Sequence, residues 1–121
     1  MYEVMVEEYF SAAHYLKGYD GKCSQLHGHN WKVQVFLTSN ILDSIGMVID
    51  FKELKELVNI VIDKLDHYCL NDLDIFAKKN PTSENIAYFI FHELAKEALP
   101  GKISKVSIWE SKAVCVIYDG K

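Results

Sequence analysis

Two long stretches of the chain alternate hydrophobic and polar residues, and each predicts a β-strand. The first runs from Tyr2 to about His14, with Glu8 interrupting its apolar face, and the second from His27 to about Ser39. Side chains two residues apart in a strand point to the same face, so one face of each strand is expected in the core. The predicted core faces are Tyr2, Val4, Val6, Phe10, Ala12 and His14 in the first strand and His27, His29, Trp31, Val33, Val35 and Leu37 in the second.

Two stretches in the middle of the chain follow helical spacing instead. Asp50, with Glu53 three residues later, is an N-cap pattern, and apolar residues at helical spacing continue the predicted helix to about Asp66-His67. The segment 80–83, Asn-Pro-Thr-Ser, starts a second helix that continues through 86–99.

The end of the chain predicts a β-hairpin. Residues 103–110 and 113–118 alternate as strands do, and Ser111-Lys112 lies between them. The element order is therefore β-β-α-α-β-β. It predicts a single α+β domain over residues 1–121, with a four-stranded antiparallel sheet and two helices on one face.

Composition narrows the class of protein. The chain has 121 residues, half of them hydrophobic, which suits one domain with a packed core. Its net charge of -4 argues against a nucleic acid or an anionic membrane as the main partner, and the longest apolar run, 86–91, is too short to span a bilayer. Three cysteines at unrelated spacings and no signal-peptide pattern at the start predict a cytoplasmic protein.

Three of the five histidines are predicted to meet. If the first two strands pair antiparallel, the end of one lies beside the start of the other, which places His14 close to His27 and His29 on the apolar face. Three imidazoles on one apolar face need three partners, and one metal ion satisfies all of them. Three nitrogen ligands with an open position suit catalytic zinc, because closed structural sites are more often rich in cysteine.

Cys23 lies in the loop just before these histidines and has two functional interpretations. It could be a fourth ligand that closes a structural site. It could instead stay free as an acid–base or nucleophilic thiolate favoured by the nearby cation. Its position beside Gly21 favours the second role.

Two further carboxylates are candidates for chemistry. Asp66 precedes His67 at a predicted helix end, where it could orient the imidazole, although adjacent residues on a helix do not face each other. Without that pairing, His67 would only interact with the helix dipole. Glu110 ends a strand face, where it is either paired by adjacent N–H donors, such as those of an aminopyrimidine ring, or exposed in a turn.

Taken together, these motifs resemble the 6-pyruvoyltetrahydropterin synthase family, over nearly the whole chain. Within that family they are similar to the bacterial and archaeal branch that forms 6-carboxytetrahydropterin. The matching segments are Phe10-Ser11-Ala12-Ala13-His14, Cys23 followed by His27-Gly28-His29-Asn30, Gly46-Met47-Val48-Ile49-Asp50-Phe51-Lys52, Leu65-Asp66-His67-Tyr68-Cys69-Leu70-Asn71, Asn80-Pro81-Thr82-Ser83-Glu84-Asn85 and Trp109-Glu110-Ser111.

The resemblance implies roles for the candidate residues. It implies zinc on the three histidines, Cys23 as the catalytic thiolate, and a proton relay completed by Asp66 and His67. It also implies that Glu110 anchors the pterin, with Thr82, Ser83 and Glu84 nearby from a neighbouring subunit. The implied architecture is the tunnelling fold (T-fold), assembled as a hexamer of two trimers.

The implied substrate is 7,8-dihydroneopterin triphosphate. The implied products are 6-carboxy-5,6,7,8-tetrahydropterin, acetaldehyde and triphosphate, in the pathway to queuosine and related 7-deazaguanines. The short spacing between Cys23 and His27 favours this branch, and a pyruvoyl-forming synthase is the alternative. A relative in which glutamate replaces the cysteine fits less well, because Cys23 is present.

A hypothesis of another class is a non-catalytic binding module stabilised by zinc, with Cys23 as the fourth ligand. Replacing Cys23 distinguishes the binding module from the enzyme. The module would lose its metal and unfold, whereas the enzyme would keep its metal and its fold and lose turnover.

Overall fold

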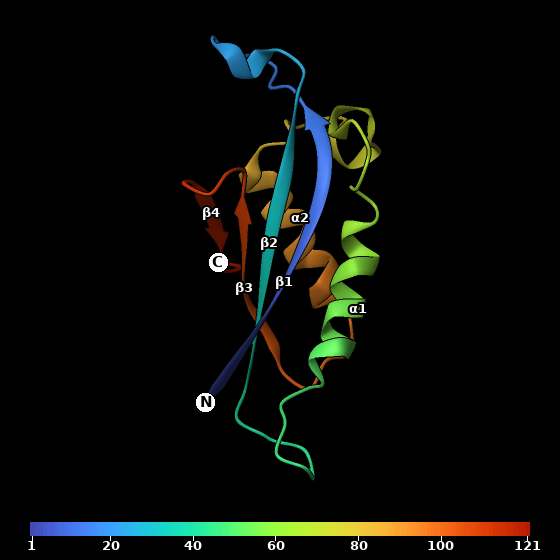
Figure 1. Ribbon diagram of the computed structural model, residues 1–121, viewed down its shortest axis with the longest axis vertical. Coiled ribbons are helices and arrows are strands. Elements are labelled where there is room, and N and C mark those ends of the chain that lie inside the picture. Colours follow the sequence, from blue (N-terminus) through green and yellow to red (C-terminus); the bar gives the residue numbers. More distant parts are fainter.

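The computed structural model describes residues 1–121 as a four-stranded sheet covered on one face by two helices (Figure 1). The strands are β1 (Tyr2–His14), β2 (His27–Ser39), β3 (Lys102–Trp109) and β4 (Cys115–Tyr118). They lie in the order β1-β2-β3-β4, and every neighbouring pair is antiparallel. The predicted α+β class and element order are confirmed.

The β1–β2 pair is the longest part of the sheet and sets the geometry at its upper end. Its register runs without interruption from Tyr2 opposite Ser39 to His14 opposite His27. Both strands turn the predicted face inward, with Phe10 and Trp31 stacked at 5.9 Å between ring centroids, but Tyr2 at the start of β1 is exposed and does not join the core as predicted. An uninterrupted register fixes which side chains share a face, because a slip of one residue would turn all of them over.

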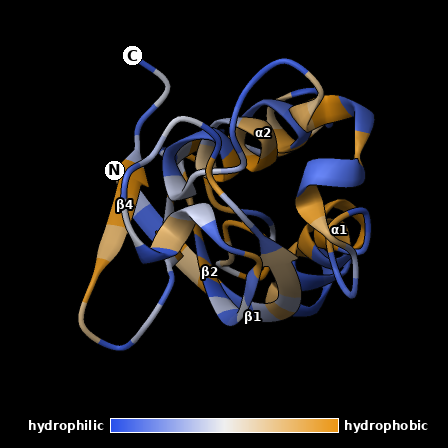
Figure 2. Cartoon of the chain, turned by 90° about the horizontal axis from the view of Figure 1, so that it is seen from above, coloured by the Kyte–Doolittle hydropathy of each residue, from blue (hydrophilic) through white to orange (hydrophobic).

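Both helices begin where the capping residues predicted. Helix α1 (Phe51–Ile62) starts at Asp50, whose carboxylate accepts the Lys52 N–H at 2.8 Å. Helix α2 (Ser83–Ala95) starts at Thr82, whose hydroxyl oxygen accepts the Asn85 N–H at 3.1 Å. Viewed down the long axis, both helices lie on the same side of the sheet (Figure 2).

Both helices end earlier than predicted. Helix α1 ends at Ile62 instead of continuing to Asp66-His67, because the chain turns there and His67 adopts a left-handed φ of 65°. Leu65 is still fully buried beyond the helix end, which explains why the apolar pattern ran on. Helix α2 ends at Ala95 instead of Leu99. The hairpin strands are likewise shorter at the turn, which spans residues 110–114.

The core lies between the sheet and the two helices. It includes Trp31, Val33, Leu54, Ile86 and Ile108, all fully buried. The opposite face of the sheet, here called the open face, has no helix over it and leaves Met5, Tyr9 and Ile117 exposed. No helix is both long enough and apolar enough to cross a membrane.

The segment between the helices covers the free edge of β1. The His67 N–H donates to the Ser11 carbonyl at 2.6 Å, and the Ala13 N–H donates to the Tyr68 carbonyl at 3.1 Å. Cys69 continues this contact as a parallel bridge to Ala13. Two short 3-10 turns follow, at Leu70–Asp72 and Asp74–Phe76. The edge strand is thereby satisfied at its upper end, beside the three histidines.

Candidate active site

The strand register brings the three predicted histidines together on the helix-covered face. His14 lies directly opposite His27, and Ala12 lies opposite His29. The candidate ligand atoms of the three rings all lie within 4.8 Å of one another. Ring centroids are 4.6 Å apart for His14 and His27 and 4.8 Å apart for His27 and His29. One metal ion can therefore contact all three side chains.

Backbone carbonyls fix the tautomer of two of these rings. His14 Nδ1 donates to the Pro81 carbonyl at 2.7 Å, and His27 Nδ1 donates to the Gln25 carbonyl at 2.7 Å. A carbonyl oxygen can only accept, so Nδ1 carries a proton, and in the neutral ring the lone pair is on Nε2. Metal-binding histidines are typically oriented by this kind of outer hydrogen bond.

The third ring, that of His29, has a nitrogen without a hydrogen-bond partner. Its Nε2 is buried and has no hydrogen-bond partner. Burial lowers the pKa of both His14 and His29, while the Glu110 carboxylate acts in the opposite direction on each. The lowered pKa favours the neutral form of His14 and His29, which is the form that binds a metal. A buried nitrogen without a partner is costly, and a metal ion on the three rings would satisfy it.

Glu110 is paired, not free in a turn. It is half-buried, and its Oε1 accepts the hydroxyl of Ser83 at 2.7 Å. Ser83 itself is buried at the start of α2. Pro81, two residues before Ser83, accepts from His14, so one short stretch of the chain contacts both Glu110 and the cluster. Its second oxygen makes no hydrogen bond within the chain and can accept from a ligand.

Three consecutive residues predicted near the ligand, Thr82, Ser83 and Glu84, have different surroundings in the structure. Ser83 lies in the site of its own chain, so its contact with Glu110 needs no neighbouring subunit. Thr82 caps α2. Glu84 is exposed in the first turn of the helix. Helix periodicity explains the separation, because successive residues point about 100° apart.

Asp66 and His67 form a pair despite being adjacent in sequence. His67 Nδ1 lies 2.9 Å from Asp66 Oδ1, and that same oxygen accepts the Ser11 N–H at 2.9 Å. The Ser11 N–H is the main cause of a lowered pKa at Asp66, and the His67 contact adds to it. The left-handed φ of His67 turns the ring back onto the carboxylate, which a helix could not do. The expectation of a histidine acting only on the helix dipole was wrong.

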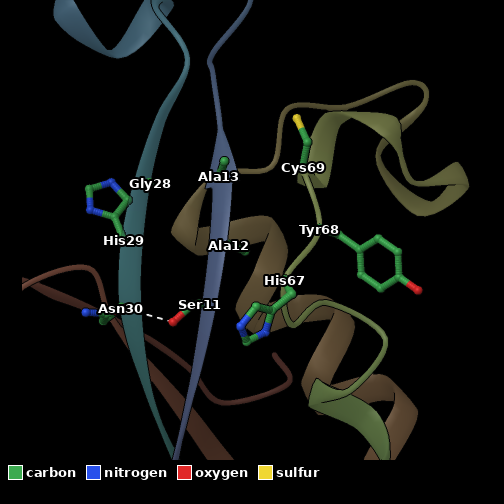
Figure 3. Close-up of a pocket in the computed structure, with 9 residues that line it drawn as sticks. All are labelled: Ser11, Ala12, Ala13, Gly28, His29, Asn30, His67, Tyr68 and Cys69. Atoms are coloured by element: carbon green, nitrogen blue, oxygen red, sulfur yellow. Dashed lines mark hydrogen bonds between the residues drawn. The ribbon is translucent and has the colours of Figure 1, made fainter.

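Within one chain, this pair lies apart from the histidine cluster. His67 lines a hollow of about 460 Å³ together with Ser11 and Asn30, which belong to the open face and are hydrogen-bonded at 2.7 Å, and His29 is the one member of the cluster that borders the same hollow. Figure 3 shows His29 and His67 on opposite sides of the β1–β2 strand pair. The His67 side chain is 81% exposed. The pair is therefore presented outward and is not part of the candidate metal group of its own chain.

Cys23 is not part of the histidine cluster. It lies in a short 3-10 turn, Lys22–Ser24, and is partly exposed. Its carbonyl accepts the Leu16 N–H at 2.8 Å, which ties the turn to the residues just after β1. The candidate metal group contains the three histidines and no sulfur. The geometry favours a three-histidine site with an open position over a site closed by Cys23.

Sequence reasoning missed two features of the site region. The Pro81 carbonyl orients His14, and two asparagine side chains grip the loop after β1: Asn71 bonds the N–H and carbonyl of Tyr15, and Asn80 bonds those of Lys17, all at 2.8–2.9 Å. A further contact that the sequence did not indicate is that of His92, whose Nε2 lies 3.1 Å from the Tyr118 hydroxyl. These contacts join positions far apart in the chain, so no local sequence pattern predicts them.

Comparison with known proteins identifies the family. The family model for 6-pyruvoyl tetrahydropterin synthase matches residues 3–121. A 6-carboxy-5,6,7,8-tetrahydropterin synthase from Synechocystis sp. is 42% identical, covering 84% of this chain and 81% of its own. A dihydroneopterin monophosphate aldolase from Pyrococcus furiosus is 39% identical, covering 84% and 82%. The solved 6-pyruvoyl tetrahydropterin synthase of Caenorhabditis elegans is 33% identical, with a TM-score of 0.87 over 100% of this chain and 98% of its own.

These relatives share the tunnelling fold, and their names describe enzymes. The match covers nearly the whole chain, from the first strand to the last. The chain therefore belongs to the 6-pyruvoyl tetrahydropterin synthase family of enzymes.

Proposed function

We propose that this protein is a zinc-dependent lyase that converts 7,8-dihydroneopterin triphosphate into 6-carboxy-5,6,7,8-tetrahydropterin, acetaldehyde and triphosphate. The observation that carries the proposal is the cluster of three histidines, together with the half-buried carboxylate of Glu110 at the start of α2. The name of the Synechocystis relative supports this reaction. The pathway proposed for the product is that of queuosine and related 7-deazaguanines, in the cytoplasm.

The pterin is proposed to bind through Glu110. A carboxylate accepts two parallel N–H bonds, which the amino group and adjacent ring N–H of a pterin can donate. Ser83 already occupies one carboxylate oxygen through its hydroxyl and so holds the group in place. This orientation points the side chain of the pterin toward the histidines.

His14, His27 and His29 are proposed to hold zinc through their unprotonated nitrogens. A zinc ion bound there supplies Lewis acidity that polarises the side-chain oxygens of the substrate. Cys23 is proposed to move a proton between the ring and the side chain of the pterin. His67 is proposed to exchange the second proton, with Asp66 holding its Nδ1–H.

The separation of the two groups implies that one chain does not complete the site alone. The Asp66–His67 pair lies at the free edge of β1 with its imidazole exposed, while the histidines lie on the covered face. We propose that the pair serves the histidines of a neighbouring subunit, in a hexamer of two trimers. The exposed apolar residues of the open face support assembly through that surface.

The sequence left two alternatives to this reaction: another reaction at the same residues and a module without catalysis. A pyruvoyl-forming synthase would also eliminate triphosphate but would keep the side chain whole. A non-catalytic zinc module would need Cys23 as a ligand, and Cys23 lies outside the cluster.

The experiment that tests the proposed ligand anchor is Glu110→Gln. We expect zinc content and melting temperature to stay near wild type while pterin affinity, followed by fluorescence quenching, falls about tenfold or more, because a charged acceptor is lost. Ser83→Ala is the matched variant, since it keeps the carboxylate and removes only its support. Unchanged affinity in Glu110→Gln would contradict the anchor.

A further inference from the structure

A second hollow, of about 330 Å³, lies beside the start of α2. Its polar lining consists of Lys17, Asn71, Lys78, Lys79 and Asn80. We infer that this hollow, here called the lysine hollow, binds the polyphosphate arm of the substrate. The inference rests on the proposed function and adds to it the residues that select a polyphosphate over a monophosphate.

The three lysines of the hollow are free of acidic partners. No carboxylate lines it, and neither Lys17, Lys78 nor Lys79 forms an ion pair within the chain. Nine of the 13 lysines form no ion pair, and the hollow brings three of these nine together. Lys79 Nζ lies 4.7 Å from the centre of the Tyr88 ring, which lines a neighbouring hollow, and Lys17 and Lys78 are exposed residues. Positive charges gathered in a concave site attract a multiply charged anion.

Backbone contacts hold the hollow in a defined shape. Asn80 Oδ1 accepts the Lys17 N–H at 2.9 Å, and Asn80 Nδ2 donates to the Lys17 carbonyl at 2.8 Å. The carbonyl of Asn80 in turn accepts the Asn85 side chain at 2.7 Å. These bonds place the two sides of the hollow, at residue 17 and residues 78–80, at a fixed separation. An anion therefore meets lysines from two segments that are far apart in the sequence.

The lysine hollow adjoins the histidine cluster. Pro81, which follows Asn80, accepts the Nδ1–H of His14, and Lys17 follows His14 by three residues. A substrate whose side chain reaches the histidines would therefore extend its phosphates toward these lysines. In Figure 1, the segment between α1 and α2 lies beside the upper end of β1, which is the end that carries His14.

The charge of the hollow favours a polyphosphate. Lysine binds phosphate as a point charge, and three lysines match an anion with several charges better than a single phosphate. The chain contains no arginine, so lysine must supply this charge. The Pyrococcus furiosus relative is named for a monophosphate substrate, and the hollow distinguishes the two substrate classes in this chain.

The test uses the zinc-loaded protein and inorganic anions. Calorimetric titration compares tripolyphosphate with orthophosphate, and zinc content is measured before and after because tripolyphosphate binds metals. The variant combines Lys17→Ala with Lys78→Ala and Lys79→Ala. The control combines Lys52→Ala with Lys121→Ala, which lie outside the hollow.

We expect wild type and control to bind tripolyphosphate more tightly than orthophosphate. The triple variant should lose about tenfold or more in tripolyphosphate affinity, with a weaker dependence on salt. In turnover with 7,8-dihydroneopterin triphosphate, the triple variant should raise KM more than it lowers kcat. Equal affinity in variant and wild type, or equal binding of the two anions, would overturn the inference.

The two proposals fail in different ways. If tripolyphosphate binding depends on the lysines but no pterin product forms, the lysine hollow stands and the proposed reaction falls. If the product forms with a KM that the three substitutions leave unchanged, the reaction stands and the hollow is not its phosphate site.

Discussion

Two backbone carbonyls decide what the histidines can do at the scale of single residues. Pro81 and Gln25 accept the Nδ1 protons of His14 and His27, which leaves the opposite nitrogens free. His29 adds a buried nitrogen with no partner. The cluster is thereby prepared for a metal ion before any ion binds.

Substitutions should separate metal binding from catalysis. We expect His29→Ala to lose most bound zinc, because one of three ligands is gone, while Cys23→Ala keeps zinc and loses turnover. Metal content by mass spectrometry and melting by calorimetry measure both variants. Cys115→Ala is the control, since Cys115 is exposed at the start of β4. Zinc loss in Cys23→Ala would favour the structural module.

The lowered pKa of Asp66 predicts an acid dependence of stability. The hydrogen bond from the Ser11 N–H is the main stabilisation of the Asp66 carboxylate. The pKa of Asp66 in the folded protein therefore lies below the model-compound value of 3.8. The carboxylate therefore contributes stability above pH 3.8 that is lost as the pH falls through the folded pKa. Asp66→Asn keeps an acceptor for Ser11 and removes the charge.

Denaturant unfolding at several pH values measures this contribution. The difference in free energy of unfolding between wild type and Asp66→Asn should be constant near neutral pH and should shrink in acid below pH 3.8. A difference that grows as the pH falls would contradict the assignment.

The positions of side chains were predictable where the two-residue alternation of a strand determined them. Alternation alone placed His14, His27 and His29 on one face, and the register then brought them together. The Asp66–His67 contact was not predictable from spacing, because it depends on a left-handed backbone at His67 that no local residue signals. Glu110 could be singled out, but its partner Ser83 is 27 residues away.

At the scale of elements, paired side-chain bonds hold the loop between β1 and β2. Asn80 makes two bonds to the backbone of Lys17. Asn80→Ala should cost about 1–3 kcal/mol, since each lost bond is worth about 0.5–1.5 kcal/mol. Hydrogen exchange of residues 15–26 should rise with it. Asn40→Ala, in the exposed connection after β2, is the control. Unchanged exchange in Asn80→Ala would show that the loop is held by other contacts.

The turn before β3 depends on a glycine. A Cβ at Gly101 would lie 2.2 Å from the Thr38 carbonyl oxygen, whereas a Cβ at Gly28 would find its nearest neighbour at 3.8 Å. We expect Gly101→Ala to destabilise the protein by about 1–3 kcal/mol through overpacking. Gly28→Ala should be neutral by comparison. Denaturant unfolding measures both, and equal stabilities would contradict the close approach.

Strand bounds were predictable to the residue in β1 and β2, because two-residue alternation ends sharply there. Helix ends were not. The apolar period of α1 continues to Leu65 although the helix stops at Ile62, since the turn after it remains packed in the core. An apolar pattern in the sequence predicts which residues are buried. It does not predict whether a helix or a turn buries them.

At the scale of the whole molecule, the open face of the sheet predicts assembly. Ile117 is 59% exposed on that face, opposite the buried Ser107. Ile117→Lys should leave the monomer folded and shift sedimentation toward smaller species, because a charge would enter an apolar contact. Ile60→Lys is the control on the exposed surface of α1. A wild-type protein that sediments as a monomer would contradict assembly through this face.

The products of the reaction distinguish the carboxy-forming lyase from the other candidates. The zinc-loaded protein is incubated with 7,8-dihydroneopterin triphosphate, aldehydes are trapped, and the pterin is identified by mass spectrometry. We predict acetaldehyde together with 6-carboxy-5,6,7,8-tetrahydropterin. A pyruvoyl product without acetaldehyde, or unreacted substrate with zinc present, would contradict it.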